Sequence, residues 1–158
     1  IFIKMHACDK IDLKILTLLQ KNARITMTEL AESVGLSTTP VTERVRRMER
    51  DGVISGYHAR LNPQALGQHL LVFVEIKLRS KSGNIFEDFR REVMHIPQIM
   101  ECHLVSGEYD YLIKVRLPNM NAYRDRLGSI LLQLPAAAES RSYVVMEEVK
   151  EDFLLNLG

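Results

Sequence analysis

The sequence predicts an α+β protein of two domains, in which three short helices precede a βαββαβ unit. Two observations support this prediction. Apolar residues recur at helical spacing in three segments before residue 53, and from Leu70 onward the apolar pattern alternates between strand and helix periods. The 158 residues, 46% hydrophobic and 26% charged, are enough for one ordinary domain or two small ones. This balance is typical of a globular protein and excludes a disordered chain.

The first two helices are predicted from their caps as well as from their apolar stripes. The first runs from about Lys10 to Gln20, with Asp9 positioned to cap its amino end. The second starts at Thr26, which forms a T-x-x-E capping box with Glu29, and it closes at Gly35. A helix, a glycine turn and another helix are therefore expected in succession.

The third helix is predicted to begin after Ser37 and to end at Gly52. Pro40 lies in its first turn, where the missing N–H has little effect. An extended segment and a turn containing Asn62-Pro63 and Gly67 follow. We therefore divide the chain into a winged-helix-like helix-turn-helix domain (1–54), a linker (55–69) and a second domain (70–158).

The second domain is predicted to be ferredoxin-like, with an antiparallel sheet and both helices on one face. Its expected strands are 70–78, 99–106, 109–117 and 141–150, its helices are 84–95 and 121–134, and Gly107-Glu108 forms the turn between the middle strands. Apolar strand residues are assigned to the other sheet face: Leu71, Phe73, Leu104 and Leu112. So many apolar side chains favour dimerisation through the sheet.

The third helix has two distinct sides. Val41, Val45 and Met48 form an apolar side, and polar residues form the other. The predicted DNA-binding residues are Thr38, Thr39, Thr42, Glu43, Arg46, Arg47 and Arg50. Those near the amino end, with Arg46, would read bases, whereas Arg44, Arg47, Arg50, Lys21 and Arg24 would meet phosphates. The alternative is a solvated face in which these arginines form helical salt bridges with Glu43, Glu49 and Asp51.

Charge and motif content narrow the function further. Residues 1–60 carry 10 Lys and Arg against 7 Asp and Glu, so the basic excess lies with the helical domain. The five histidines have no metal-ligand spacing, and no nucleophile elbow or phosphate loop occurs, so no catalytic residue, metal or cofactor is predicted. Two widely spaced cysteines and short apolar runs favour a reducing cytoplasm and no membrane partner. Residues 1–4 are expected to be an upstream remnant.

The chain closely resembles the Lrp/AsnC family of bacterial and archaeal transcription regulators. The residues that carry the resemblance are DKIDLKIL (9–16), VGLSTTPVTERVRRMERDGVI (34–54), LLVFVEI (70–76), ECHLVSGEYDYLIKVRLPNMNAYR (101–124) and YVVMEEVK (143–150). They extend over nearly the full length. Ala136-Ala137-Ala138 stands where leucine-responsive members have a glycine-containing loop.

The resemblance implies an amino-acid-responsive regulator of double-stranded DNA. Family members form homodimers through the sheet and assemble further, commonly as octamers, with a small amino acid bound between dimers. The positions implied to bind the effector are Leu104, Val105, Ser106, Gly107, Tyr109, Asp110, Met120, Tyr143, Val144 and Val145. Gly107 would admit backbone N–H groups, Asp110 would face an ammonium, and deformable Met120 would accept leucine or methionine.

Two other interpretations remain open at this point. Gly107 and Asp110 are also what an ordinary hairpin turn requires, and Leu104 with Met120 would then be core residues. The helix-turn-helix would alternatively mediate protein contacts in an amino-acid-sensing assembly protein. An enzyme is the least favoured class, because Cys102 and His103 are neighbours on a strand and point to opposite faces.

Overall fold

The structure, a computed structural model, describes residues 8–80 and 83–158 and contains two compact units. The first unit extends to Arg60 and also includes residues 150–158, and the second unit is Leu61–Val149. The division falls inside the segment 55–69 that the sequence assigns to a linker. The return of residues 150–158 to the first unit was not predicted. The suggested remnant, residues 1–4, lies outside the described residues.

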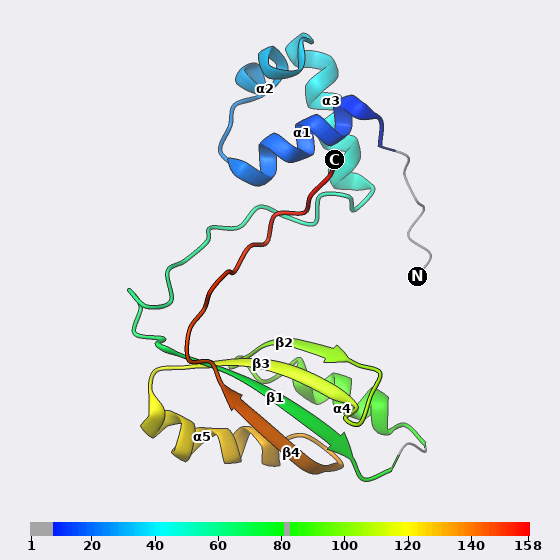
Figure 1. Cartoon of the computed structure of the whole chain (residues 1–158). Coiled ribbons are helices and arrows are strands. Elements are labelled where there is room, and N and C mark those ends of the chain that lie inside the picture. Colours follow the sequence, from blue (N-terminus) through cyan, green and yellow to red (C-terminus); the bar gives the residue numbers. More distant parts are fainter. Residues whose placement is uncertain (1–7, 81–82) are drawn as a thin grey trace. The chain divides into compact units, whose positions relative to one another are not determined.

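The first unit contains the three predicted helices, α1 (Lys10–Lys21), α2 (Met27–Val34) and α3 (Thr38–Arg50) (Figure 1). The expected capping box at Thr26 with Glu29 is present, and Asp9 caps α1 as predicted. Asp9 also forms a capping box with Asp12, which was not predicted. Gly35 closes α2 with a φ of 73°, in the left-handed region that glycine enters without a Cβ penalty. The turn between α2 and α3 is therefore set by local sequence.

An apolar cluster holds the three helices together. Its buried residues are Ile15, Leu19, Leu30, Ala31, Val41, Val45 and Met48. Val41, Val45 and Met48 come from α3, so the predicted apolar side of this helix is the packed one. The segment after α3, Val53 to Leu61, contains neither helix nor strand.

The second unit is a four-stranded antiparallel sheet with the order β2-β3-β1-β4. Its elements are β1 (Leu70–Leu78), α4 (Ile85–Val93), β2 (Ile99–Leu104), β3 (Tyr111–Leu117), α5 (Met120–Leu132) and β4 (Ala137–Val144). The predicted βαββαβ order is confirmed. Both helices cover the same face of the sheet, as predicted (Figure 1).

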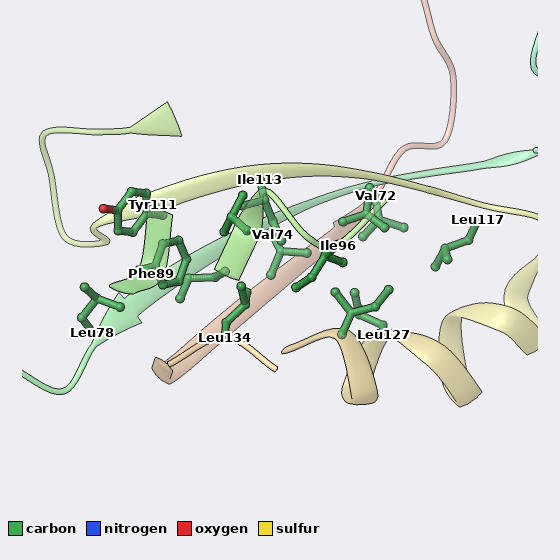
Figure 2. Close-up of a cluster of buried hydrophobic side chains, with 14 of the residues drawn as sticks. Val72, Val74, Leu78, Phe89, Ile96, Tyr111, Ile113, Leu117, Leu127 and Leu134 are labelled. Carbon is green, nitrogen blue, oxygen red and sulfur yellow. The ribbon is translucent and has the colours of Figure 1, made fainter. Parts of the chain in front are cut away.

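The core of this unit lies between the sheet and the two helices. Val72 and Val74 of β1, Phe89 of α4 and Leu127 of α5 all belong to this buried cluster (Figure 2). The Phe89 ring stacks on Tyr111, with 4.1 Å between centroids and 14° between planes. The two helices and the sheet are thus joined by continuous apolar packing.

The last strand differs from its prediction. β4 begins at Ala137 and ends at Val144, whereas the sequence places it at 141–150. β4 is defined by its pairing with β1, in which Lys77 lies opposite Glu139 and Leu78 lies opposite Ala137. Ala136, at the turn before β4, has a φ of 59°, a left-handed conformation that glycine adopts more easily.

The sheet face opposite the helices is partly apolar and partly charged. Leu71, Phe73 and Leu112 lie on it as predicted, but Leu104 pairs with Tyr111 and so belongs to the helix-covered side. Lys114 and Arg116 are buried on this face. Their ion-pair partners are Glu101, 3.1 Å from Lys114, and Glu148, 2.5 Å from Arg116. None of the described helices combines the length and apolar character needed to cross a bilayer.

Candidate nucleic-acid interface and ligand site

The polar side of α3 is largely open to solvent. Thr38, Thr39, Glu43, Arg46 and Arg50 are exposed, while Thr42 is half-buried. The hydroxyl of Thr42 donates to the carbonyl oxygen of Thr38 at 2.8 Å. The helix therefore presents two hydroxyls, a carboxylate and two guanidinium groups along one exposed side. Groups of these kinds can form hydrogen bonds with base edges in a DNA groove.

Two of the four α3 arginines have a different position from the one expected. Arg44 Nη1 donates to Asp12 Oδ1 at 2.8 Å and to Asp9 Oδ2 at 2.7 Å, and Arg47 Nη2 donates to Asp12 Oδ2 at 2.6 Å. Both were expected to face phosphates. The structure instead uses them to fasten α3 to α1, since the side chain of Asp12 is only 1% exposed.

These ion pairs also shift the pKa values of Asp9 and Arg44. The pKa of Asp9 lies below its ordinary value, first because the Asp12 backbone N–H donates to its carboxylate and second because Arg44 does. The pKa of Arg44 is raised by the same carboxylates. Both shifts favour the charged forms of Asp9 and Arg44. Arg46 and Arg50 remain as the exposed α3 arginines.

The turn between β2 and β3 carries most of the predicted effector residues. Val105 N–H donates to the Asp110 carbonyl at 3.0 Å and closes the turn, and Asp110 N–H donates to the Ile76 carbonyl at 3.0 Å. Gly107 has a φ of 151°, and a Cβ at this position would meet no atom within 4 Å. The requirement for glycine is therefore conformational, and the space around Gly107 is open.

Asp110 is a buried residue, with 5% of its surface exposed. Its Oδ2 accepts a hydrogen bond from the backbone N–H of Leu78 at 2.9 Å. This bond joins the β2–β3 turn to the end of β1. In this structure Asp110 therefore positions the turn. This agrees with the alternative interpretation of the sequence, in which Asp110 serves an ordinary hairpin turn.

The predicted effector residues divide into two groups at opposite ends of the sheet (Figure 1). The residues from Leu104 to Asp110 precede β3, whereas Met120 follows it at the start of α5. β3 has 7 residues, and at about 3.3 Å per residue it separates the two ends by about 20 Å. Val144 pairs with Val72 near the Met120 end, so one chain does not form a single pocket from both groups.

Tyr143 lies between the two groups, on the face of the sheet away from the helices. It pairs with Phe73, and its hydroxyl donates to Glu75 Oε2 at 2.9 Å. Arg141, two residues earlier on the same face, has its guanidinium carbon 5.4 Å from the centroid of the Tyr109 ring. Arg141 was not predicted as a site residue. Its spacing from Tyr143 on a strand is the only sequence signal that pointed to it.

A pocket of about 490 Å³ lies in the first unit and contains none of the predicted site residues. It is formed by α1, by residues 53–58 and by the carboxy-terminal residues 153–157, with a mostly apolar lining. Gln20 holds the terminal segment there, because its amide donates to the Leu155 carbonyl at 3.1 Å and accepts from the Leu155 N–H at 2.7 Å. Within residues 8–80 and 83–158, no group of three or more His, Cys, Asp or Glu side chains is arranged to hold a metal ion.

Comparison with known proteins identifies both units. Residues 9–55 match the family model of winged helix-turn-helix DNA-binding domains, and residues 71–155 match that of the Lrp/AsnC ligand binding domain. The chain is 55% identical over 143 residues to the leucine-responsive regulatory proteins of Escherichia coli K12 and Salmonella typhimurium, which covers 90% of this chain and 87% of theirs.

Solved structures give the same result. A transcriptional regulator of Neisseria meningitidis in complex with L-Met is 34% identical, with a TM-score of 0.88 over 95% of this chain and 97% of that one. The leucine response regulatory protein of Mycobacterium tuberculosis is 34% identical, with a TM-score of 0.81 over 94% and 99% of the two chains.

Proposed function

The chain belongs to the Lrp/AsnC family of DNA-binding transcriptional regulators, and we propose that its DNA binding responds to leucine or methionine. It is a regulator with a helix-turn-helix and an amino-acid ligand domain, not an enzyme. The DNA-binding part of this function rests on one observation: α3 has a packed apolar side and an exposed side that bears Arg46 and Arg50. As part of the proposal, we place the protein in the cytoplasm, where its DNA lies.

For DNA, we assign base reading to Thr39, Thr42, Glu43 and Arg46 in the major groove. Thr38 and Arg50, at the two ends of the helix, are assigned to phosphates. Arg47 keeps a supporting role through Asp12, which sets the rotation of α3 against α1. A protein-binding helix-turn-helix is the alternative. It needs no free cation at the middle of α3, so Arg46 distinguishes the two.

Arg46→Gln is expected to weaken binding to the preferred duplex by about 5- to 150-fold, because a bidentate contact to a guanine is lost. Arg50→Gln should weaken binding to all duplexes alike and lower the slope of log K against log salt by about one. The duplex is first selected from a random-sequence pool with the unmodified protein, and affinities are then measured by fluorescence anisotropy over a salt series. Equal effects of Arg46→Gln on selected and random duplexes would reassign Arg46 to the phosphates.

For the effector, the proposal is a site shared between subunits. One subunit contributes the turn residues Leu104, Val105, Ser106, Gly107, Tyr109 and Asp110, and another contributes Met120, Val144 and Val145, with Tyr143 beside them. The separation of about 20 Å between these groups in one chain supports this arrangement. Homodimers through the outer sheet face, and four such dimers in an octamer, would bring the two groups together.

Leucine and methionine are the proposed effectors because Met120 offers a deformable apolar wall that is 49% exposed in the single chain. The named relatives favour the same two amino acids, since one group is called leucine-responsive and another was solved with L-Met. A site of this kind binds only when subunits are assembled, so its affinity should depend on protein concentration.

Titration of the full chain with leucine is expected to give a binding isotherm that disappears when the protein is diluted below its assembly concentration. Isothermal calorimetry measures the heat, and analytical ultracentrifugation at the same concentrations measures the assembly. Methionine should compete with leucine, whereas aspartate should not. Leucine binding that persists in a dissociated monomer would contradict a site shared between subunits.

A further inference from the structure

We propose that residues 150–158, which we call the carboxy-terminal tether, transmit the ligand state of the second unit to the helix-turn-helix, and that Gln20 holds the tether in place. The inference rests on the proposed function and adds to it a route by which an amino acid changes DNA binding. The tether belongs to the first unit, although the chain passes through the whole second unit before reaching it. It is therefore a second covalent connection between the units, separate from the segment 55–69.

The tether is anchored in the first unit by two polar side chains. At the end of α1, the Gln20 amide donates to the Leu155 carbonyl at 3.1 Å, and Gln20 Oε1 accepts from the Leu155 N–H at 2.7 Å. One side chain thereby satisfies both backbone groups of a tether residue. Arg60 Nη2 donates to the Glu151 carbonyl at 2.6 Å, and its guanidinium carbon lies 5.5 Å from the centroid of the Phe153 ring. The tether is thus fixed at several points along its length.

The chain is anchored in the second unit just before the tether begins. Arg116 of β3 is 8% exposed and makes a bidentate contact with Glu148, at 3.2 Å from Nη1 to Oε2 and 2.5 Å from Nη2 to Oε1. Only Val149 and Lys150 lie between Glu148 and Glu151. Three residue steps of extended chain reach at most about 11 Å. So short a segment has little freedom to absorb a displacement, and a shift at Glu148 is passed on to Glu151.

Both ends of this route meet residues with a proposed role. Val144 and Val145, which we assign to the effector site, closely precede Glu148. At the other end, α1 carries Gln20 and also Asp12, whose carboxylate accepts hydrogen bonds from α3. An effector that shifts the segment after β4 therefore acts through the tether on α1, and through α1 on the orientation of α3.

The tether is docked weakly enough to be released. Phe153 and Leu155 are 61% and 72% exposed, although they line the apolar pocket of about 490 Å³ in the first unit. Apolar burial therefore contributes little to docking, and the polar contacts of Gln20 and Arg60 contribute most. A segment with few buried apolar contacts opens at a low free energy. Docked and released states are thus both available, and an effector shifts their populations if it binds one state more tightly.

Gln20→Ala tests the tether in the assembled full chain. Hydrogen exchange at residues 151–158 measures docking, and fluorescence anisotropy measures the dissociation constant of the selected duplex with and without saturating L-leucine. For the unmodified protein we expect leucine to change this constant by about 5- to 150-fold. In Gln20→Ala the tether should exchange faster, and the effect of leucine should fall below about 2-fold, because the released tether no longer moves α1. Calorimetry should show that leucine still binds.

Leu155→Pro breaks the same contact from the other side, because proline has no N–H to donate to Gln20. If the two variants remove one contact, the tether of the double variant should exchange no faster than that of Gln20→Ala alone. Gln133→Ala is the matched control. It removes the same side chain from α5, where the amide donates to the Ser129 carbonyl at 3.1 Å, and it should keep the full effect of leucine.

A full effect of leucine on DNA binding by Gln20→Ala, with the tether released, would overturn the proposal. Unchanged hydrogen exchange of the tether in Gln20→Ala would overturn it as well, and so would the loss of leucine binding itself. An unmodified protein whose DNA binding responds to neither leucine nor methionine would instead remove the proposed function, which keeps the two failures distinct.

Discussion

Phe89→Ala is expected to lower the free energy of unfolding of the second unit by about 3–5 kcal/mol. Phe89 is 0% exposed and stacks on Tyr111, at the point where α4 meets β3 (Figure 2). The alanine leaves a cavity that the sheet cannot fill, because β1 and β3 are fixed by their ladder. Chemical denaturation of the full chain followed by hydrogen exchange at residues 70–144 measures the loss in this unit.

Phe86→Ala is the control on the same helix. Phe86 is only half-buried, and its ring lies 6.2 Å from that of Tyr111 at 51°. We expect a loss of about 1–2 kcal/mol, since less surface is removed from contact. Equal losses for the two variants would mean that the Phe89–Tyr111 stack does not hold α4 to the sheet.

Local signals in the sequence predicted much of the fold. The cap at Asp9, the capping box at Thr26 and the glycine that ends α2 are short-range patterns, and each occurs as expected. The alternation in β1 is equally local, because it reports which sheet face is covered. Elements of this kind need no knowledge of the rest of the chain.

The last strand could not be placed in this way. Tyr143 to Val145 have strong strand preference, whereas Ala137 to Ser140 have little, so sequence favoured the later segment. Register with β1 decides otherwise, and β4 ends at Val144. Tertiary pairing overrides propensity here, because β4 is an edge strand and pairs with β1 in the described sheet.

The sequence predicted which kinds of residue belong to the candidate sites better than it predicted where each side chain lies. A helical wheel separates the apolar side of α3 from its polar side, but it cannot distinguish Arg46, which is exposed, from Arg47, which reaches Asp12. Likewise Met120 and Gly107 belong to one site by resemblance, yet β3 lies between them. Contacts between residues distant in sequence decided both cases.

Asp12→Ala is expected to lower the free energy of unfolding of the first unit by about 2–3 kcal/mol and to weaken DNA binding as well. Asp12 is 1% exposed and accepts from Arg44 and Arg47 on α3. Its removal takes the carboxylate partner from Arg47 and leaves Arg44 with Asp9. The value lies below that for a fully buried pair, because the side chains of Arg44 and Arg47 are 25% and 33% exposed and can reach water. Hydrogen exchange at residues 10–50 of the full chain measures the loss.

Asp12→Ala is expected to change DNA affinity in a way that substitution of an ordinary core residue would not. Arg44 and Arg47 are three residues apart on α3, and one carboxylate holding both of them fixes the rotation of the helix about its own axis. Freed from Asp12, α3 can turn, and Arg46 then points away from the base edges that it should read. The affinity for the selected duplex should therefore fall more than that for random duplexes.

Glu43→Ala, at an exposed carboxylate of α3, is the control for stability and should change the free energy of unfolding by less than about 0.5 kcal/mol. If Asp12→Ala destabilised the unit but kept full discrimination between duplexes, apolar packing of Val41, Val45 and Met48 would be sufficient to orient the helix.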